Sequence, residues 1–126
     1  RKLYKRIITE KNAEDLMILI WTTGELKDGR FLALLHPLTG HRHSDVRRIT
    51  YSALRKIQSP SSREYLQRGL YDTNPKTRQY CAKALAKIGN KNSLKMLKQL
   101  RNKKNFEKEY VLRAYEEAIS MLEKDI

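Results

Sequence analysis

An internal repeat is the feature that most constrains how this chain of 126 residues folds. When the sequence is aligned with itself so that Arg47 matches Arg78, the segment Ser52-Ala-Leu-Arg-Lys-Ile57 matches Lys83-Ala-Leu-Ala-Lys-Ile88. A unit of about 30 residues cannot bury its apolar face alone, so it must stack on its neighbours. The repeat therefore predicts an array of similar units instead of a single compact core.

Each unit is expected to contain two helices. Ala53, Leu54 and Ile57 follow helical spacing in the first segment, and Leu66 and Leu70 follow it in a shorter second segment. Only three prolines and five glycines interrupt the chain, which favours helices because strands would need more turns. We expect an all-α fold of about eight helices without strands, over residues 2–10, 13–26, 29–39, 44–57, 61–71, 75–88, 92–103 and 107–123.

A single domain is predicted over residues 1–126. Residues 3–8 fall near the register of a second helix, and the chain starts with Arg1 instead of methionine. We therefore expect the sequence to be a piece of a longer array. The units are predicted over residues 13–40, 41–71 and 72–104, with a capping helix over 107–123.

The stretch from Asp72 to Gly89 has the pattern Asp-x-Asn-Pro-x-Thr-Arg-x-x-Cys-x-x-Ala-Leu-x-x-Ile-Gly. It resembles a HEAT-like repeat of the type found in phycobilin lyases, and the resemblance extends over almost the whole chain. It implies an α-solenoid of stacked antiparallel helix pairs, in which an aspartate and an arginine six positions apart tie neighbouring units together. The resemblance assigns this structural role to Asp72 and Arg78 and, in the preceding unit, to Arg47. It implies a fold, which does not by itself determine a function.

Positive charge is concentrated in the middle of the chain. The net charge is +13, and residues 41–104 carry seventeen Lys or Arg against three Asp or Glu. Like charges on neighbouring helical positions repel one another, so stability alone explains this surface poorly. A basic surface of this kind is typical of proteins that bind polyanions, although a solvated basic coat is the simpler interpretation.

In HEAT-like arrays the second helix of each pair usually lines the concave face, so the resemblance places the partner there. The first helices also carry basic residues, among them Arg55, Lys56, Lys83 and Lys87, which we expect mostly on the convex side. The residues predicted to contact a partner are Arg30, Arg63, Arg68, Lys95, Lys98, Arg101, Lys103 and Lys104.

Two classes of partner fit this charge. Nucleic acid would be held through its phosphates, with steep salt dependence. An acidic protein segment would need apolar anchors among the charges, for which Tyr65, Leu70 and Tyr71 are candidates. Because HEAT-like arrays most often act as protein scaffolds, we favour the acidic protein and keep nucleic acid as the alternative.

Catalysis is not indicated by the sequence. The cluster of His41, His43 and Asp45 begins a helix among arginines, which disfavours a bound metal ion. Cys81 aligns with Thr50 and is interpreted as a small buried residue. We expect neither a cofactor nor a metal site, because no phosphate-binding or dinucleotide-binding motif is present.

One enzymatic alternative follows from the resemblance, because alkylpurine DNA glycosylases are built on HEAT-like arrays. Trp21 and Asp28 would then be the candidate groove residues, but we expect Trp21 to pack in the core on an apolar stripe with Leu16 and Ile18. No apolar run reaches the roughly 20 residues of a membrane-spanning helix. The single cysteine excludes an internal disulfide, and a cytoplasmic location is the expectation.

Overall fold

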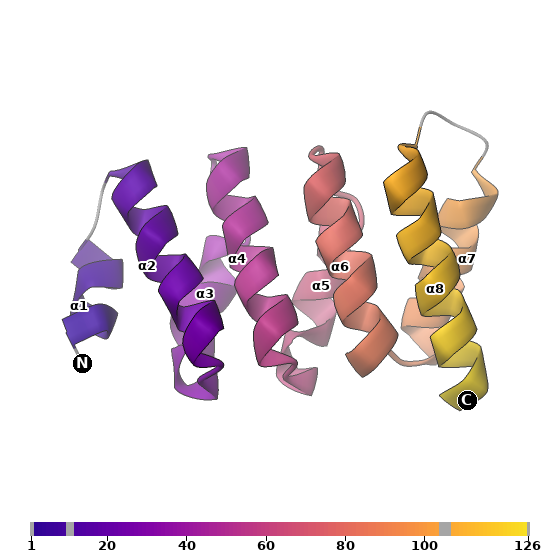
Figure 1. Ribbon diagram of the computed structural model, residues 1–126, viewed down its shortest axis with the longest axis horizontal. Coiled ribbons are helices and arrows are strands. Elements are labelled where there is room, and N and C mark those ends of the chain that lie inside the picture. Colours follow the sequence, from indigo (N-terminus) through magenta and orange to yellow (C-terminus); the bar gives the residue numbers. More distant parts are fainter. Residues whose placement is uncertain (1, 10–11, 104–106, 126) are drawn as a thin grey trace.

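The computed structural model describes residues 2–9, 12–103 and 107–125, and within these ranges every regular element is a helix (Figure 1). The prediction of an all-α fold without strands is confirmed for this part of the chain. The α-helices are α1 (Lys2–Thr9), α2 (Ala13–Leu26), α3 (Leu32–Leu38), α4 (Ser44–Ile57), α5 (Arg63–Gly69), α6 (Pro75–Ile88), α7 (Lys91–Asn102) and α8 (Glu109–Asp125).

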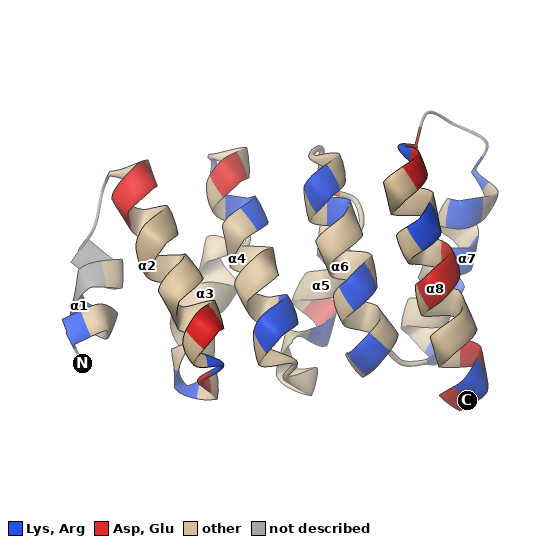
Figure 2. Cartoon of the chain, in the orientation of Figure 1, with Lys and Arg blue, Asp and Glu red and all other residues tan. Residues whose placement is uncertain are grey.

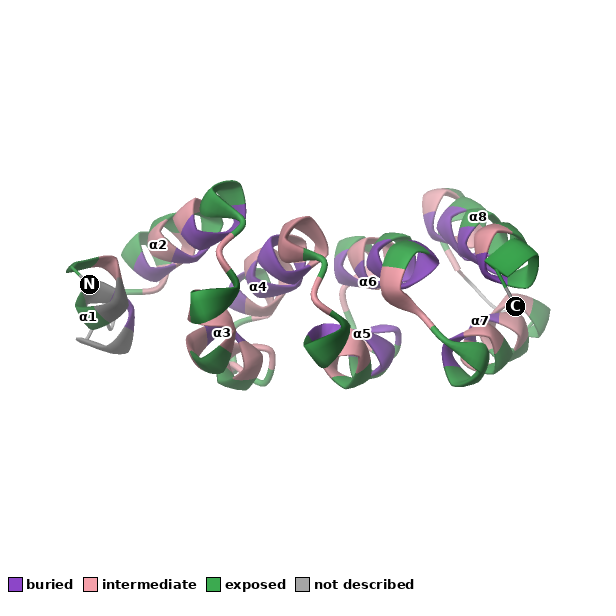
Figure 3. Ribbon diagram, turned by 90° about the horizontal axis from the view of Figure 1, so that it is seen from below, coloured by how far each residue is buried: buried purple, intermediate pink, exposed green. Residues whose placement is uncertain are grey.

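The helices form two layers (Figure 3). The first helices of the units, α2, α4, α6 and α8, lie side by side in one layer, and α3, α5 and α7 lie in the other. Each of α3 and α5 is preceded by a short 3-10 turn, Gly29–Phe31 or Pro60–Ser62, where a continuous helix was predicted. The arrangement is the predicted solenoid of antiparallel helix pairs.

Capping side chains fix where the long helices begin. Asn12, Asn74 and Asn90 each accept a hydrogen bond from backbone N–H groups in the first turn of α2, α6 and α7. Lys27 and Gln58 end α2 and α4 in the left-handed conformation, with φ of 51° and 58°. These caps set the lengths of the first helices, and therefore which side chains reach the ends of that layer.

The core repeats with the sequence. Leu35, Leu66 and Leu97 occupy the same position of successive repeats in α3, α5 and α7, and all three are fully buried. Leu54 and Leu85 occupy equivalent buried positions in α4 and α6. Each unit therefore contributes the same side chains to one continuous apolar layer between the two rows of helices.

Small residues allow the first helices to approach closely. A Cβ atom added to Gly24 of α2 would lie 2.9 Å from the Cα atom of Ala53 in α4. Ala84 and Ala118 stand at the positions that match Ala53 in α6 and α8, and all three alanines are buried. The second helices meet through larger groups, as where the rings of His36 and Tyr65 stack at 4.1 Å.

The array bends toward the layer of first helices. Figure 3 shows that α2 and α8, at the two ends of the layer of first helices, are displaced away from the second helices relative to α4 and α6. The hollowed side is therefore that of the first helices, whereas the sequence led us to expect the second helices there. The physical reason is that the first helices pack more closely against one another than the second helices do.

Two arginines tie successive units together. The Nε atom of Arg47 donates to Asp72 of the next unit at 2.8 Å, and its Nη1 atom donates to the carbonyl oxygen of His41 at 2.9 Å. Arg78 repeats this geometry, with Nη1 donating to the carbonyl oxygen of Asp72 at 2.7 Å and Nη2 donating to Glu107 at 2.6 Å. The role of Glu107 is not evident from the sequence, because three inserted residues shift the last unit.

A second set of contacts joins the second helices. The Nε2 atom of His36 lies 2.9 Å from the Oγ atom of Ser62 in the next unit. One repeat later, Gln67 donates to the Oγ atom of Ser93 at 2.7 Å. Burial lowers the pKa of His36 below its ordinary value, and this burial favours the neutral ring.

Replacing Asp72 with alanine should lower the free energy of unfolding by about 2 kcal/mol, between the values for exposed and fully buried ion pairs. The side chain of Asp72 is only 7% exposed, so its loss leaves the guanidinium of Arg47 without its carboxylate. Urea unfolding measures the effect. The matched control is Arg113→Ala, which breaks an exposed pair with Glu109 and should change the free energy by less than about 0.5 kcal/mol. Equal effects of the two substitutions would contradict this role for Asp72.

His36→Gln should remove part of the pH dependence of stability. As the pH falls below about 6.5, the unfolded chain binds a proton at His36 that the folded chain resists, so the free energy of unfolding of the wild type falls. Glutamine is the residue that makes this contact in the next unit. Melting curves between pH 5.5 and 7.5 should show that the stability of the variant relative to the wild type increases as the pH falls. A stability difference that does not change with pH would contradict the prediction. His41 remains in both proteins, so their difference isolates His36.

Candidate interaction surface

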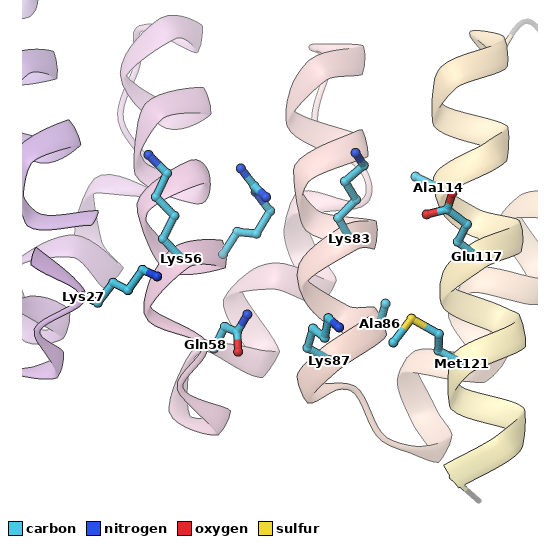
Figure 4. Close-up of a pocket in the computed structure, with 10 residues that line it drawn as sticks. Lys27, Lys56, Gln58, Lys83, Ala86, Lys87, Ala114, Glu117 and Met121 are labelled. Carbon is cyan, nitrogen blue, oxygen red and sulfur yellow. The ribbon is translucent and has the colours of Figure 1, made fainter. Parts of the chain in front are cut away.

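A broad hollow of the described surface lies on the face of the first helices. It has a volume of about 430 Å³ and runs from the end of α2 across α4 and α6 to α8 (Figure 4). Ala86 and Ala114 are among its lining residues, and Glu117 is the one acidic residue among them. We call it the basic trough, after the cations that line it: Lys27, Arg55, Lys56, Lys83 and Lys87.

The repeat itself places these cations together. Lys56 and Lys87 occupy the same position of successive repeats, near the ends of α4 and α6, and Lys83 lies one turn before Lys87. Cations in the last turn of a helix are stabilised by the helix dipole, which favours Lys56 and Lys87 at these positions. The dipole does not explain why Lys83 and the capping residue Lys27 extend toward the same hollow.

Most of this charge is not neutralised. Lys56 forms an ion pair with Glu25 of α2. Within residues 2–9, 12–103 and 107–125, no ion pair is formed by Lys27, Lys83 or Lys87. Figure 2 shows the same imbalance, with blue predominating on α6 and red marking parts of α2 and α8. The trough therefore has a positive potential bordered by acidic residues on both sides.

Arg55 stands at a repeat position that is occupied by small residues in the neighbouring units. Gly24 and Ala86 are its equivalents in the preceding and the following repeat. The guanidinium lies over the ring of Tyr80 at 5.4 Å, and its Nε atom is buried without a hydrogen-bond acceptor among the described residues. A buried donor without a partner is destabilising, so this arginine is poorly explained by stability alone.

The residues predicted to bind a partner lie elsewhere, and several are engaged within the chain. Lys98 pairs with Glu123 of α8 at 2.9 Å, and Arg101 pairs with Glu116 of α8 at 3.3 Å. Both cations therefore lie against a neighbouring helix. Lys95 lines a separate shallow hollow along α7.

The remaining second-helix cations are also distributed over separate contacts. Arg30 pairs with Asp28, whose pKa falls below its ordinary value because of the hydrogen bond from Arg30. Arg63 donates from Nε to the carbonyl oxygen of Ile88 at 2.6 Å, and the guanidinium of Arg68 lies over the ring of Tyr65. Lys103 is exposed at the end of α7, and Lys104 lies outside the described residues. None of the described members of this set lines the basic trough.

Among the described residues, no group of three or more His, Cys, Asp or Glu side chains is placed to hold a metal ion. The rings of His41 and His43 stack at 5.5 Å, and the Nδ1 atom of His41 accepts a hydrogen bond from the backbone N–H of His43. Cys81 is fully buried, and burial raises the pKa of its thiol well above the ordinary value. A thiol in this state is not a nucleophile.

Trp21 is not a core residue, contrary to our expectation from the sequence. It is 50% exposed, while Leu16 and Ile20 of the same helix take the core positions. The apolar stripe of α2 is wider than the face it buries, so residue type alone does not show which members turn inward. Trp21 precedes Lys83 by two repeats, and Lys83 lines the basic trough.

A family model for HEAT repeats matches residues 31–120. The chain belongs to the HEAT-repeat family. HEAT repeats generally mediate protein interaction or scaffolding, and the family is typically non-catalytic. The finer resemblance to the repeats of phycobilin lyases stays a prediction. No curated protein matches this HEAT-repeat chain, and none of its described helices is long and apolar enough to cross a membrane.

Arg55→Ala should leave the free energy of unfolding within about 1 kcal/mol of the wild type, because it removes a buried donor that has no acceptor in the described part of the chain. Alanine is the residue at the equivalent position 86. The control is Leu54→Ala, which deletes a fully buried side chain next to it and should lower that free energy by about 2–5 kcal/mol. If urea unfolding shows that Arg55→Ala is as destabilising as Leu54→Ala, then Arg55 is a structural residue.

Proposed function

We propose that this HEAT-repeat chain is a non-catalytic interaction module whose basic trough docks an acidic segment of a partner protein. The observation that carries the proposal is that five cations, from α4, α6 and the C-terminal cap of α2, converge on one hollow with a single lining acid. An entering carboxylate would relieve the repulsion among Lys83, Lys87 and Lys27, and it would offer an acceptor to Arg55.

The borders of the trough favour a short acidic segment over a long polyanion. Glu25 lies on the α2 side and Glu117 on the α8 side. A nucleic-acid strand crossing all four first helices would bring its phosphates close to both carboxylates, which is unfavourable. A peptide can place its acidic residues over α4 and α6 and other residues over the borders. The usual role of the HEAT-repeat family supports the same choice.

The double substitution K83E/K87E should weaken binding of a labelled poly-glutamate peptide about tenfold at low salt, because two charge reversals together are worth on the order of 1.4 kcal/mol. Fluorescence anisotropy measures the affinity, and the effect should shrink as salt is added. The matched control is K91E/K95E, which reverses two exposed lysines at the same spacing on the layer of second helices.

The proposal fails if the control weakens binding as much as K83E/K87E, since the second helices would then carry the surface predicted from the sequence. It also fails if duplex DNA or single-stranded RNA binds far more tightly than poly-glutamate, with a steep salt dependence. Equal, weak binding of all three polyanions would show that the charge is only a solvated coat.

A further inference from the structure

The basic trough adjoins an apolar hollow on the same face of the array. This hollow has a volume of about 340 Å³ and lies between α2 and α4. Ile18 and Trp21, at 63% and 50% exposure, are its most exposed apolar members. We call it the apolar patch, after the apolar residues that line it together with Glu14: Met17, Ile18, Trp21 and Ile49.

The exposure of Trp21 is a property of its register in the repeat. Ser52, Lys83 and Glu117 occupy the equivalent positions in α4, α6 and α8, the last after the three-residue insertion. Lys83 and Glu117 are exposed and line the basic trough. Ser52 is half-buried, so three of the four residues at this register, Trp21 among them, face solvent on the hollowed side.

Another helix stacked on the outer side of α2 would not cover Trp21. Such a helix would contact the residues of α2 that match the buried Val46 and Ala53 of α4, which are Asp15 and Thr22. The exposed ring consequently needs a different occupant, because an exposed tryptophan beside other apolar side chains is typical of a binding surface.

Lys56 joins the two hollows into one surface. It lines the basic trough, and its Nζ atom lies 5.4 Å from the centroid of the Trp21 ring. A ligand that reaches Lys56 with a carboxylate is therefore within one side chain of the apolar patch. Tryptophan and arginine are the residue types that most often dominate binding energy at interfaces, and this surface presents one of each, Trp21 and Arg55.

We propose that the apolar patch seats a large apolar side chain of the same acidic segment that the basic trough docks. The inference rests on the proposed function and specifies its partner: an acidic peptide segment with a leucine-sized or aromatic anchor. Charge complementarity selects this occupant, because a segment that covers Trp21 also lies beside Lys56, which lines the basic trough.

Two synthetic peptides of about twelve residues, the length of roughly 18 Å of helix, test the proposal on the whole chain. One combines glutamates with two leucines a turn apart, and the other replaces the leucines with serines at the same charge. The wild type should bind the leucine peptide about tenfold more tightly, because the patch buries an apolar side chain. Trp21 is the single tryptophan, so its fluorescence emission should shift to shorter wavelength when the leucine peptide is added, but not when the serine peptide is added.

Trp21→Ser, which installs the residue found at position 52, should abolish the tenfold preference and leave the affinity for the serine peptide within about twofold. The matched control is Leu26→Ser, which removes a 58% exposed apolar side chain of α2 that does not line the patch. It should keep the preference. If Trp21→Ser does not fold, Ile18→Ser takes its place with the same expected result.

A preference that survives both Trp21→Ser and Ile18→Ser overturns the inference, as does a preference that Leu26→Ser abolishes equally. Sedimentation showing that Trp21→Ser dissociates a dimer would also overturn it, because the patch would then be an interface between copies of the chain. The proposed function is separable: K83E/K87E should weaken both peptides equally. If it weakens neither, the proposed function fails whatever Trp21 does.

Discussion

The close approach of the first helices is the constraint on which the rest of this structure depends. Gly24 and Ala53 bring α2 and α4 so near that a methyl group at position 24 would clash with the backbone of α4. Alanines continue this packing into α6 and α8, while the second helices keep larger side chains between them. The layer of first helices is therefore the shorter one, and the array bends toward it (Figure 3).

That bend gathers positive charge around one hollow, where we propose that it docks an acidic partner. Lys56 and Lys87 occupy the same position of successive repeats and Lys83 lies one turn before Lys87, so the curvature brings them around one hollow. Arg55 is the exception to the rule of small residues between the first helices, and its Nε atom, which has no hydrogen-bond acceptor among the described residues, belongs to a side chain that lines the same hollow. Arg47 and Arg78 tie successive units together near the starts of α4 and α6, whereas Lys56 and Lys87 lie near the ends of these helices.

The sequence was sufficient to predict the helices, because a short internal repeat with helical spacing leaves few other folds. It was not sufficient to predict the direction of the bend, which depends on differences in spacing between two layers that both have apolar cores. The choice of partner residues depended on the expected bend toward the second helices. Lys98 and Arg101 were therefore assigned to an open face, although they pair with α8. The exposure of Trp21 could have been inferred from its alignment with Lys83, a signal that composition alone obscures.

We propose that the first helices carry the binding surface, and nuclear magnetic resonance tests this proposal most directly. Titrating the labelled chain with a poly-glutamate peptide should shift the resonances of residues that line the basic trough on α4 and α6, with Arg55 and Lys83 among the largest changes. The side chains of Lys95 and Lys98 on α7 should change little. Shifts concentrated on α3, α5 and α7, or spread evenly over both layers, would contradict the account.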